Sequence, residues 1–212
     1  MPFRQTFAIV PACGHSTRMG RPKLALPFRG HTVIECVVSA LRDGGVEQVV
    51  VITGPHVPEL VTPARAAGAA VLELSDPTPD MRATVEAGLA WLQERYQPTA
   101  EDWWILAPGD HPVLAADVVR ELLTAAAESD DRDVIVPVHA GRRGHPALLR
   151  WRLVDAIRSM QIDRGINSLL RELTSRTREL SVNDASILVD LDTPEDYERL
   201  NGEADPRISA HP

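Results

Sequence analysis

A run of glycine, hydroxyl and cationic residues near the amino end of the chain has the composition of a phosphate-binding loop. Residues 11–23, PACGHSTRMGRPK, come directly after the apolar residues 7–10. Backbone N–H groups of such a loop can bind phosphate oxygens, while Arg18 and Lys23 neutralise their charge. This spacing predicts a nucleoside triphosphate site at the carboxyl end of the first strand. The alternative is a glycine turn that carries surface cations.

Two common phosphate-binding motifs do not match this segment. In a P-loop, G-x-x-x-x-G-K-[ST], the lysine follows the second glycine, but Gly14 and Gly20 are too far apart and Lys23 lies further on. A dinucleotide-binding G-x-G-x-x-G motif needs a third glycine, which this segment does not place at the required spacing. The segment therefore predicts a different kind of nucleotide-binding loop.

Two acidic segments further along the chain offer carboxylates for phosphoryl chemistry. Asp110 directly follows one apolar run, and Asp190 ends another, with Asp192 two residues on. Two carboxylates together with phosphate oxygens and water suit Mg²⁺. For Asp110 the alternative is a residue that closes an Asx-type turn. We favour Asp190 as the second ligand, because Asp192 lies in the capping region of the last expected helix; the reverse assignment stays open.

Strand-like and helix-like segments alternate along the chain and must position these residues. The expected strands are 7–10, 48–53, 70–74, 103–107, 134–138, 147–150, 178–182 and 187–189, and the expected helices are 32–41, 58–67, 81–94, 115–128, 152–160, 166–173 and 193–200. This order predicts an α/β fold with right-handed βαβ units around a mostly parallel sheet. Ligands of such sheets bind beyond the carboxyl ends of the strands, where both the loop and Asp110 lie.

The expected organisation is one domain over residues 1–201. Residues 1–138 form its nucleotide-binding half and residues 139–201 its acceptor-facing half, while residues 202–212 have little apolar content and should form a flexible tail.

Composition excludes several classes of protein. A chain of 212 residues with a net charge of −8 does not offer the basic face of a non-specific nucleic-acid binder. Its two cysteines are far apart and give neither a disulfide framework nor a metal-binding pair, which fits a reducing cytoplasm. We see no signal peptide and no apolar run of the ~20 residues that a membrane span requires. We therefore expect a cytoplasmic protein without nucleic-acid or membrane partners.

Four motifs in order resemble the molybdenum cofactor cytidylyltransferase family of molybdopterin nucleotidyltransferase-like proteins. Residues 11–23 are similar to its L-A-A-G-x-S-x-R-M-G-x-P-K, and Asp110 matches its D-x-P acid. Residues 141–146 resemble its G-x-x-G-H-P loop, and residues 190–196 resemble its D-x-D-T-P-E-D. The resemblance covers about residues 7–200. It implies a Rossmann-like three-layer nucleotidyltransferase fold, of the nucleotide-diphospho-sugar transferase type. The implied enzyme moves a nucleoside monophosphate from a triphosphate to the phosphate of molybdopterin, releases pyrophosphate and uses Mg²⁺.

The resemblance also implies a role for each matching residue. The catalytic residues would be Arg18, Lys23 and Asp110; the nucleotide-binding residues Pro11, Ala12, Cys13, Gly14, Ser16, Arg18, Lys23, Met81, Thr84 and Asp110; the metal ligands Asp110 and Asp190; and the acceptor-binding residues Arg143, Gly144 and His145. Alternatives stay open at three of them. Thr84 could belong to the first turn of a helix without binding the nucleotide. His145 could be a histidine that packs in a turn without binding the acceptor. For Cys13 we expect a small buried filler rather than a nucleophile.

The loop also bears on the substrate. Ala12-Cys13-Gly14 and Pro22-Lys23 favour CTP over GTP, because the guanylyl branch usually has a second glycine in this loop and an acid before the lysine. The alternatives are a transferase of the same fold that uses GTP or a sugar or polyol phosphate, and a non-catalytic carrier or chaperone of the molybdenum cofactor. A molybdenum hydroxylase-type enzyme is a further expected partner, as recipient of the product.

Overall fold

The computed structural model describes residues 5–128, 131–161 and 165–202, in which one eight-stranded sheet is the central layer. Its strands are β1 (Thr6–Ala12), β4 (Gln48–Thr53), β5 (Ala70–Glu73), β6 (Trp103–Leu106), β7 (Val134–His139), β8 (Arg142–Arg143), β9 (Ala147–Arg150) and β10 (Thr177–Ser181). The order is β10-β7-β9-β6-β1-β4-β5, and β8 pairs with β7. A separate hairpin consists of β2 (Pro27–Phe28) and β3 (His31–Thr32).

Most neighbouring strands are parallel. β1 is parallel to β4 and β6, β4 to β5, and β7 to β10. β9 runs antiparallel to both of its neighbours, β6 and β7, and β8 is antiparallel to β7. Strands from both expected halves of the chain therefore join one sheet.

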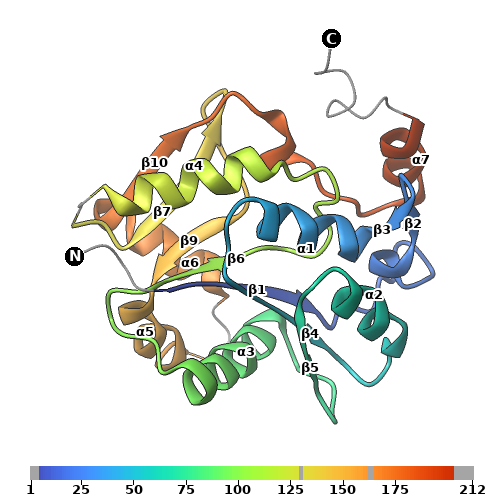
Figure 1. Ribbon diagram of the computed structural model, residues 1–212, viewed down its shortest axis with the longest axis horizontal. Helices are drawn as coiled ribbons and strands as arrows, with labels where there is room; N and C mark the ends of the chain where they lie inside the picture. The colour runs from blue at the N-terminus through green and yellow to red at the C-terminus, as the bar shows by residue number, and fades with distance from the viewer. Residues whose placement is uncertain (1–4, 129–130, 162–164, 203–212) are drawn as a thin grey trace.

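Helices cover both faces of the sheet (Figure 1). The helices are α1 (Val33–Asp43), α2 (Val61–Ala66), α3 (Met81–Tyr96), α4 (Ala116–Ala127), α5 (Val154–Arg158), α6 (Ile166–Glu172) and α7 (Pro194–Gly202). Buried residues of α1, α2, α4 and α7 belong to one hydrophobic cluster, and those of α3, α5 and α6 to another. The layers are thus helix, sheet and helix, which confirms the predicted three-layer α/β fold. In the part of the chain that the structure describes, no helix is long and apolar enough to cross a membrane.

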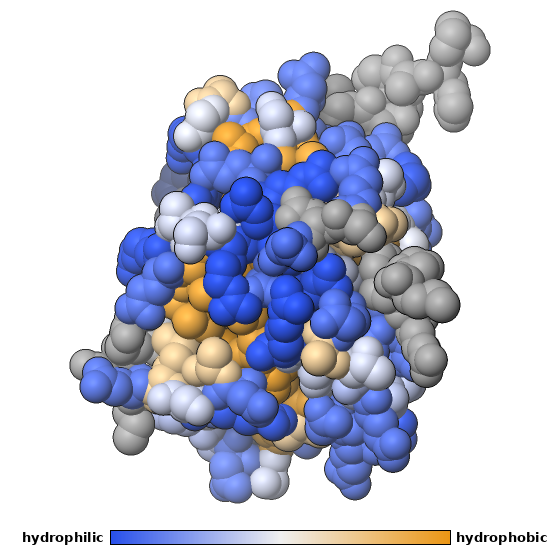
Figure 2. Space-filling model, turned by 90° about the vertical axis from the view of Figure 1, so that its left-hand side faces the viewer, coloured by the Kyte–Doolittle hydropathy of each residue, from blue (hydrophilic) through white to orange (hydrophobic). Residues whose placement is uncertain are grey.

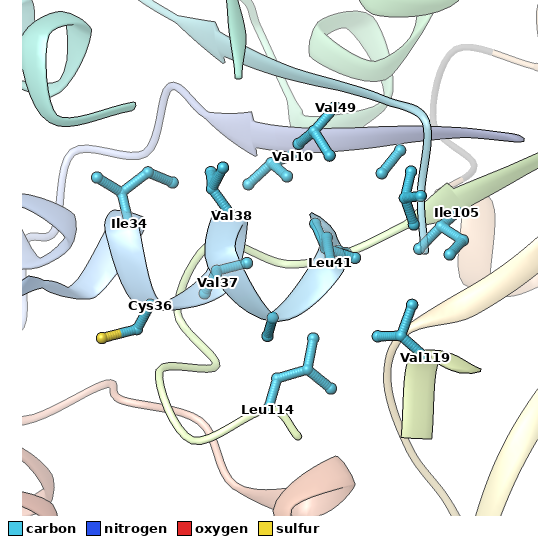
Figure 3. Packing of buried hydrophobic residues seen from close by; sticks show 14 of the residues in the cluster. Val10, Ile34, Cys36, Val37, Val38, Leu41, Val49, Ile105, Leu114 and Val119 are labelled. Carbon is cyan, nitrogen blue, oxygen red and sulfur yellow. The ribbon is translucent and has the colours of Figure 1, made fainter. Parts of the chain in front are cut away.

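Helix α1 shows how apolar periodicity builds this fold. Thr32 and Glu35 form a capping box that satisfies the first N–H groups of the helix. The apolar face of α1, with Ile34, Val38 and Leu41, packs against buried residues of β1, β4, β6 and α4 (Figure 3). These contacts fix the strand β1 that leads into the phosphate loop.

One expected strand is wrong. Residues 187–189 are apolar and were expected to pair in the sheet, but Ala185–Leu188 forms a 3-10 helix. The side chain of Asp184 accepts from the N–H of Ser186 and starts this helix. Ile187 is fully buried, and its carbonyl accepts from the N–H of His145. The apolar run therefore reflects burial under the 141–146 loop rather than a place in the sheet.

Helix α3 points its amino end at the carboxyl edge of the sheet. Asp80 caps it by accepting from the N–H of Ala83 at 2.8 Å, as the sequence predicts. Gly88 lets the helix approach β1 and β4 closely, because a Cβ there would lie 2.9 Å from Cδ1 of Ile52. This contact brings the first turn of α3 next to the end of β1.

The opposite edge of the sheet carries a network of ion pairs. The fully buried carboxylate of Asp133 contacts the guanidinium groups of Arg152 and Arg176. Glu101 contacts Arg150 and Arg152 nearby. Figure 2 shows the side of the molecule that lies on the left in Figure 1. This side is largely hydrophilic, with a smaller apolar area.

Candidate active site

A cavity of about 480 Å³ lies beyond the carboxyl ends of β1 and β6. Its size is typical of small-molecule sites. It is lined by Pro11, Ala12, Cys13, Gly14, His15, Ser16, Thr17, Arg18, Lys23, Leu24, Thr78, Pro79, Asp80, Met81, Thr84, Pro108, Gly109, Asp110 and Asp192. All ten residues predicted to bind the nucleotide are among them. This brings the amino-terminal loop, the start of α3 and both acidic segments to one place.

The loop after β1 folds around Ser16. This residue has a positive φ of 49° and its carbonyl accepts from the N–H groups of Met19 and Gly20, which makes a tight turn. The hydroxyl of Ser16 accepts from the N–H of Lys23 at 3.1 Å and ties the two ends of the loop together. Gly14 faces open space, since a Cβ there would meet no atom within 4 Å. The loop thus leaves room for phosphate oxygens while fixing the base of the Lys23 side chain.

Lys23 joins two carboxylates at the end of the cavity. Its Nζ lies 2.7 Å from Oδ2 of Asp110 and 2.7 Å from Oδ1 of Asp192. Nη1 of Arg18 lies 2.6 Å from the other oxygen of Asp192, with most of its side chain exposed. Two cations and two acids from distant parts of the chain therefore form one cluster.

These contacts shift the pKa values of the cluster. Burial by itself lowers the pKa of Lys23, but the hydrogen bonds and charges of Asp110 and Asp192 outweigh it, so the pKa is raised above its usual value. The hydrogen bond from Lys23, supported by its charge and that of Arg18, lowers the pKa of Asp192 despite partial burial. Both groups of the Lys23–Asp192 pair are thus charged at neutral pH.

Asp192 and Asp190 occupy different surroundings. Thr193 caps α7: it accepts from the N–H of Asp196, whose carboxylate accepts from the N–H groups of Asp192 and Thr193. The carboxylate of Asp192 is therefore free of the capping role and contacts Lys23 instead. Among the described residues Asp192 lines the cavity, whereas Asp190 is exposed outside it. The structure thus places Asp192 rather than Asp190 at the cavity, and the choice between them as metal ligand stays a prediction.

The buried residue between these acids fixes their positions. Leu191 is fully buried, and its N–H donates to the carbonyl of Asp110 at 2.9 Å. This bond holds the 190–192 segment beside the end of β6. The carboxylate of Asp190 acts electrostatically on His111 and His145.

Hydroxyl and thiol groups also line the cavity. The hydroxyls of Thr78 and Thr84 lie 2.6 Å apart, and Thr84 also donates to the carbonyl of Asp80. Thr84 therefore lies in the first turn of α3 and also lines the cavity. Burial raises the pKa of the Cys13 thiol, and hydrogen bonds with Thr84 and Thr78 offset this only in part. Cys13 is a protonated thiol at neutral pH, which argues against a nucleophile, but it is partly exposed and lines the cavity rather than filling the core as expected. Met81 is exposed at the cavity wall.

The predicted acceptor-binding residues form a second group beside the cavity. The exposed Arg143 pairs with Glu179 at 2.7 Å. The N–H of Gly144 donates to the carbonyl of Pro137, which holds the loop on the end of β7. His145 packs edge-to-face on the buried His111, with ring centroids 5.3 Å apart. Burial and the neighbouring His111 lower the pKa of His145 to about 4, and burial also lowers that of His111.

Thr78, His111 and His15 are among the residues of this region to which the sequence assigned no role. Thr78 belongs to an irregular polar segment, so nothing in its pattern indicates a cavity wall. His111 lies between Asp110 and Pro112, and that proximity is a signal that could have found it. His15, which lines the cavity, stacks on the ring of His56 at 4.2 Å between centroids. Only the fold reveals this pair, because the two residues come from different loops.

The donor set at the cluster suits a divalent cation. Carboxylate oxygens are the protein ligands that Mg²⁺ prefers. The ammonium of Lys23 already sits between Asp110 and Asp192, which shows that the two carboxylates converge on one cationic position. No group of three or more histidine, cysteine or acidic side chains in the described ranges forms a metal site. A cation at this position would have two protein carboxylates and would need substrate oxygens and water to complete its coordination.

Comparison with protein families identifies the chain. A family described as "MobA-like NTP transferase domain" matches residues 8–178, from β1 to the start of β10. The chain belongs to this family. It is a nucleotidyltransferase with the MobA-like fold, as its motifs predict.

Several known proteins are similar to this chain over most of its length. The molybdenum cofactor cytidylyltransferase of Escherichia coli is 26% identical over 192 residues, which cover 89% of this chain and 92% of that protein. The nicotine blue oxidoreductase of Paenarthrobacter nicotinovorans is 27% identical over 203 residues, covering 91% and 94%. Among solved structures, Rv0371c of Mycobacterium tuberculosis superposes with a TM-score of 0.78 at 26% identity, covering 96% of this chain and 100% of that one. Relatives that this chain covers almost completely thus carry more than one named activity.

Proposed function

We propose that this protein transfers the cytidylyl group of CTP to the phosphate of molybdopterin and releases pyrophosphate. The observation that carries the proposal is the cluster of Arg18, Lys23, Asp110 and Asp192 beside the open phosphate loop. Full-length similarity to a cytidylyltransferase and the Ala12-Cys13-Gly14 sequence support CTP over GTP.

In the proposed reaction, an oxygen of the acceptor phosphate attacks the α-phosphorus of CTP. A new P–O bond forms as the bond to the β-phosphate oxygen breaks, and pyrophosphate leaves with the electron pair. The protein contributes mainly by aligning the reactants and stabilising charge. N–H groups of the loop around Gly14 and Ser16 bind the phosphates, and Lys23 and Arg18 stabilise charge on the departing pyrophosphate.

The protein groups around this centre have distinct proposed roles. Asp110 and Asp192 would hold Mg²⁺, which when bound neutralises charge on the reacting phosphates. Thr84 and Thr78 offer hydroxyls in the cavity wall, which suits hydrogen bonding to the nucleoside. The acceptor would approach from the side of His145, whose low pKa keeps it neutral and able to hydrogen-bond with phosphate or pterin groups. Arg143 already pairs with Glu179, so it would reach the acceptor only by leaving that carboxylate.

The proposed activity also suggests a cellular compartment and a recipient of the product. Both cysteines are free thiols, which agrees with a reducing cytoplasm. A molybdenum hydroxylase-type enzyme would receive the cytosine dinucleotide product. Neither point affects the chemistry at Asp110 and Lys23.

The test measures Mg²⁺-dependent pyrophosphate release from CTP, GTP, UTP and ATP with molybdopterin as acceptor. We expect release with CTP, and an Asp110→Asn variant should lose more than about 100-fold of the rate, because the charged transition state loses a fixed partner. Asp192→Asn should lose far more activity than the neighbouring Asp190→Asn. The reverse order would restore Asp190 as the metal ligand.

The other outcomes are equally specific. A preference for GTP would assign the chain to guanylyl transfer. Absence of release with every nucleotide, from protein that is folded by circular dichroism, would favour another phosphate acceptor or a carrier of the cofactor. Since a full-length relative is named an oxidoreductase, direct measurement of nucleotidyl transfer decides the substrates where similarity does not.

A further inference from the structure

The side chain of Lys23 occupies the position that a divalent cation would need. Its ammonium makes two contacts of 2.7 Å, one to Asp110 and one to Asp192, and only 16% of the side chain is exposed. The same lysine is expected to contact the triphosphate. The carboxylates occupy two of the three N–H donors of the ammonium, so the carboxylates and the phosphates compete for the charge of Lys23.

The charge balance of the cluster makes this competition important. The positive charges of Arg18 and Lys23 are matched by the negative charges of Asp110 and Asp192, so the four side chains together are neutral. While these pairs persist, the cluster offers little net attraction to a polyanionic triphosphate. A divalent cation between the carboxylates would add two charges and leave Lys23 without its acidic partners.

The backbone around Lys23 permits a movement of the side chain alone. Its N–H is held by the hydroxyl of Ser16, and Lys23 begins the short 3-10 helix Lys23–Ala25. The four-carbon stem of a lysine is flexible and carries a mobile point charge. The ammonium can therefore turn from the carboxylates to the neighbouring phosphate loop while the backbone stays in place.

We propose that Lys23 exchanges partners when a divalent cation binds. Without the cation, Lys23 is a positioning residue: its ammonium holds the carboxylates of Asp110 and Asp192 together. When the two carboxylates take up the cation, the ammonium is released to the triphosphate. The inference rests on the proposed function in one respect, that Asp110 and Asp192 are the ligands of the cation.

The first test is binding of Mn²⁺, as a probe for Mg²⁺, to the full-length protein without nucleotide. Lys23→Met keeps the apolar stem but removes the competing charge, so it should bind Mn²⁺ roughly tenfold more tightly, the order expected when one unit charge is removed a few ångström from a divalent ion in a partly solvated site. Arg18→Met is the matched control, because it removes an equal charge from Asp192 at an exposed position. We expect it to change the affinity by less than about threefold. Asp110→Asn should abolish the site.

The second test is CTP binding by calorimetry, once in EDTA and once in Mg²⁺. In EDTA the lysine of the wild type is held by the carboxylates, so Lys23→Met should weaken CTP binding by less than about twofold. In Mg²⁺ the released lysine contributes, and the variant should bind CTP at least about tenfold more weakly, as for loss of a charged hydrogen bond. A purely structural role for Lys23 would weaken the binding of metal and nucleotide together.

Two results would overturn the inference. One is a Lys23→Met variant that binds Mn²⁺ no more tightly than the wild type. The other is a wild type whose Mn²⁺ binding is unaffected by Asp110→Asn. Failure of cytidylyl transfer gives a different pattern: Mn²⁺ and CTP binding would follow the expectations for Lys23, while no pyrophosphate is released with molybdopterin.

Discussion

Replacing Gly144 by alanine tests how closely the acceptor-side loop is fitted to the rest of the protein. The new Cβ would lie 2.4 Å from the carbonyl oxygen of Ile187 and 2.7 Å from its Cγ1. The clashing carbonyl is backbone and accepts from the N–H of His145, so no side-chain rotation relieves the contact. Overpacking of this kind costs about 1–3 kcal/mol. For a chain of this size, that lowers Tm by about 2–12 °C.

The assay combines unfolding in urea with steady-state kinetics. The loop must move away from Ile187 and will carry His145 with it, so KM for the acceptor should rise while CTP binding changes by less than about twofold. Gly202→Ala is the matched control, because a Cβ at this last residue of α7 meets no atom of the described residues within 4 Å. If Gly144→Ala lies within about 0.5 kcal/mol of the wild type, the close fit to Ile187 is refuted. A change in CTP binding without a change in KM for the acceptor would refute the placement of the loop.

Three further predictions concern stability and are measured by urea unfolding. Asp133→Asn leaves Arg152 and Arg176 without their buried partner, so it should cost about 3–5 kcal/mol while CTP binding is preserved, because these residues lie at the opposite edge of the sheet. Burial and a neighbouring histidine lower the pKa of His145 to about 4, against about 6.5 in the unfolded chain, so the unfolded state takes up the proton first as the pH falls. Stability should therefore decrease between about pH 6.5 and 4, and His145→Gln should flatten this decrease; an unchanged pH profile would contradict the assignment. Asp80→Ala removes the cap of α3 and should cost about 1 kcal/mol; no loss would mean that the cap contributes nothing.

The sequence predicted best where one physical signal dominates. Residues 48–53 form an uninterrupted apolar strand because parallel strands in the middle layer are buried on both faces, and β4 has these same bounds. Trp103 and Trp104 pack into the two different clusters on either face of β6, as alternation requires. Asp80 has the side chain and position of a helix cap, and it caps α3.

The sequence was less informative where tertiary contacts decide. The apolar residues 187–189 have the pattern of a strand. A 3-10 helix can bury Ile187 under the 141–146 loop equally well, so the pattern alone does not decide between them. Asp190 and Asp192 are two residues apart, and either could have faced the phosphate loop. The choice depends on the backbone bond between Leu191 and Asp110 and on capping by Thr193, which join parts of the chain that local patterns do not relate.

The predicted flexible tail begins within the last helix of the described residues. Residues 202–212 were expected to be flexible, but Gly202 is the last residue of α7 and residues 203–212 lie outside the described residues. The tail therefore remains a prediction from composition. The helix before it has a clear structural role, because Tyr197 donates to the carbonyl of Pro27 in the β2–β3 hairpin and holds α7 beside it (Figure 1).

The ion pair between Arg18 and Asp192 joins residues 174 positions apart. During synthesis the phosphate loop is made well before the acid that pairs with it. Closing so long a loop costs entropy that local contacts do not repay, so this end of the cavity should assemble late in folding. A nascent chain that has completed β1, β4 and β6 would still lack one of its two carboxylates. The order of synthesis thus delays formation of the complete proposed cation site until residue 192 has been made.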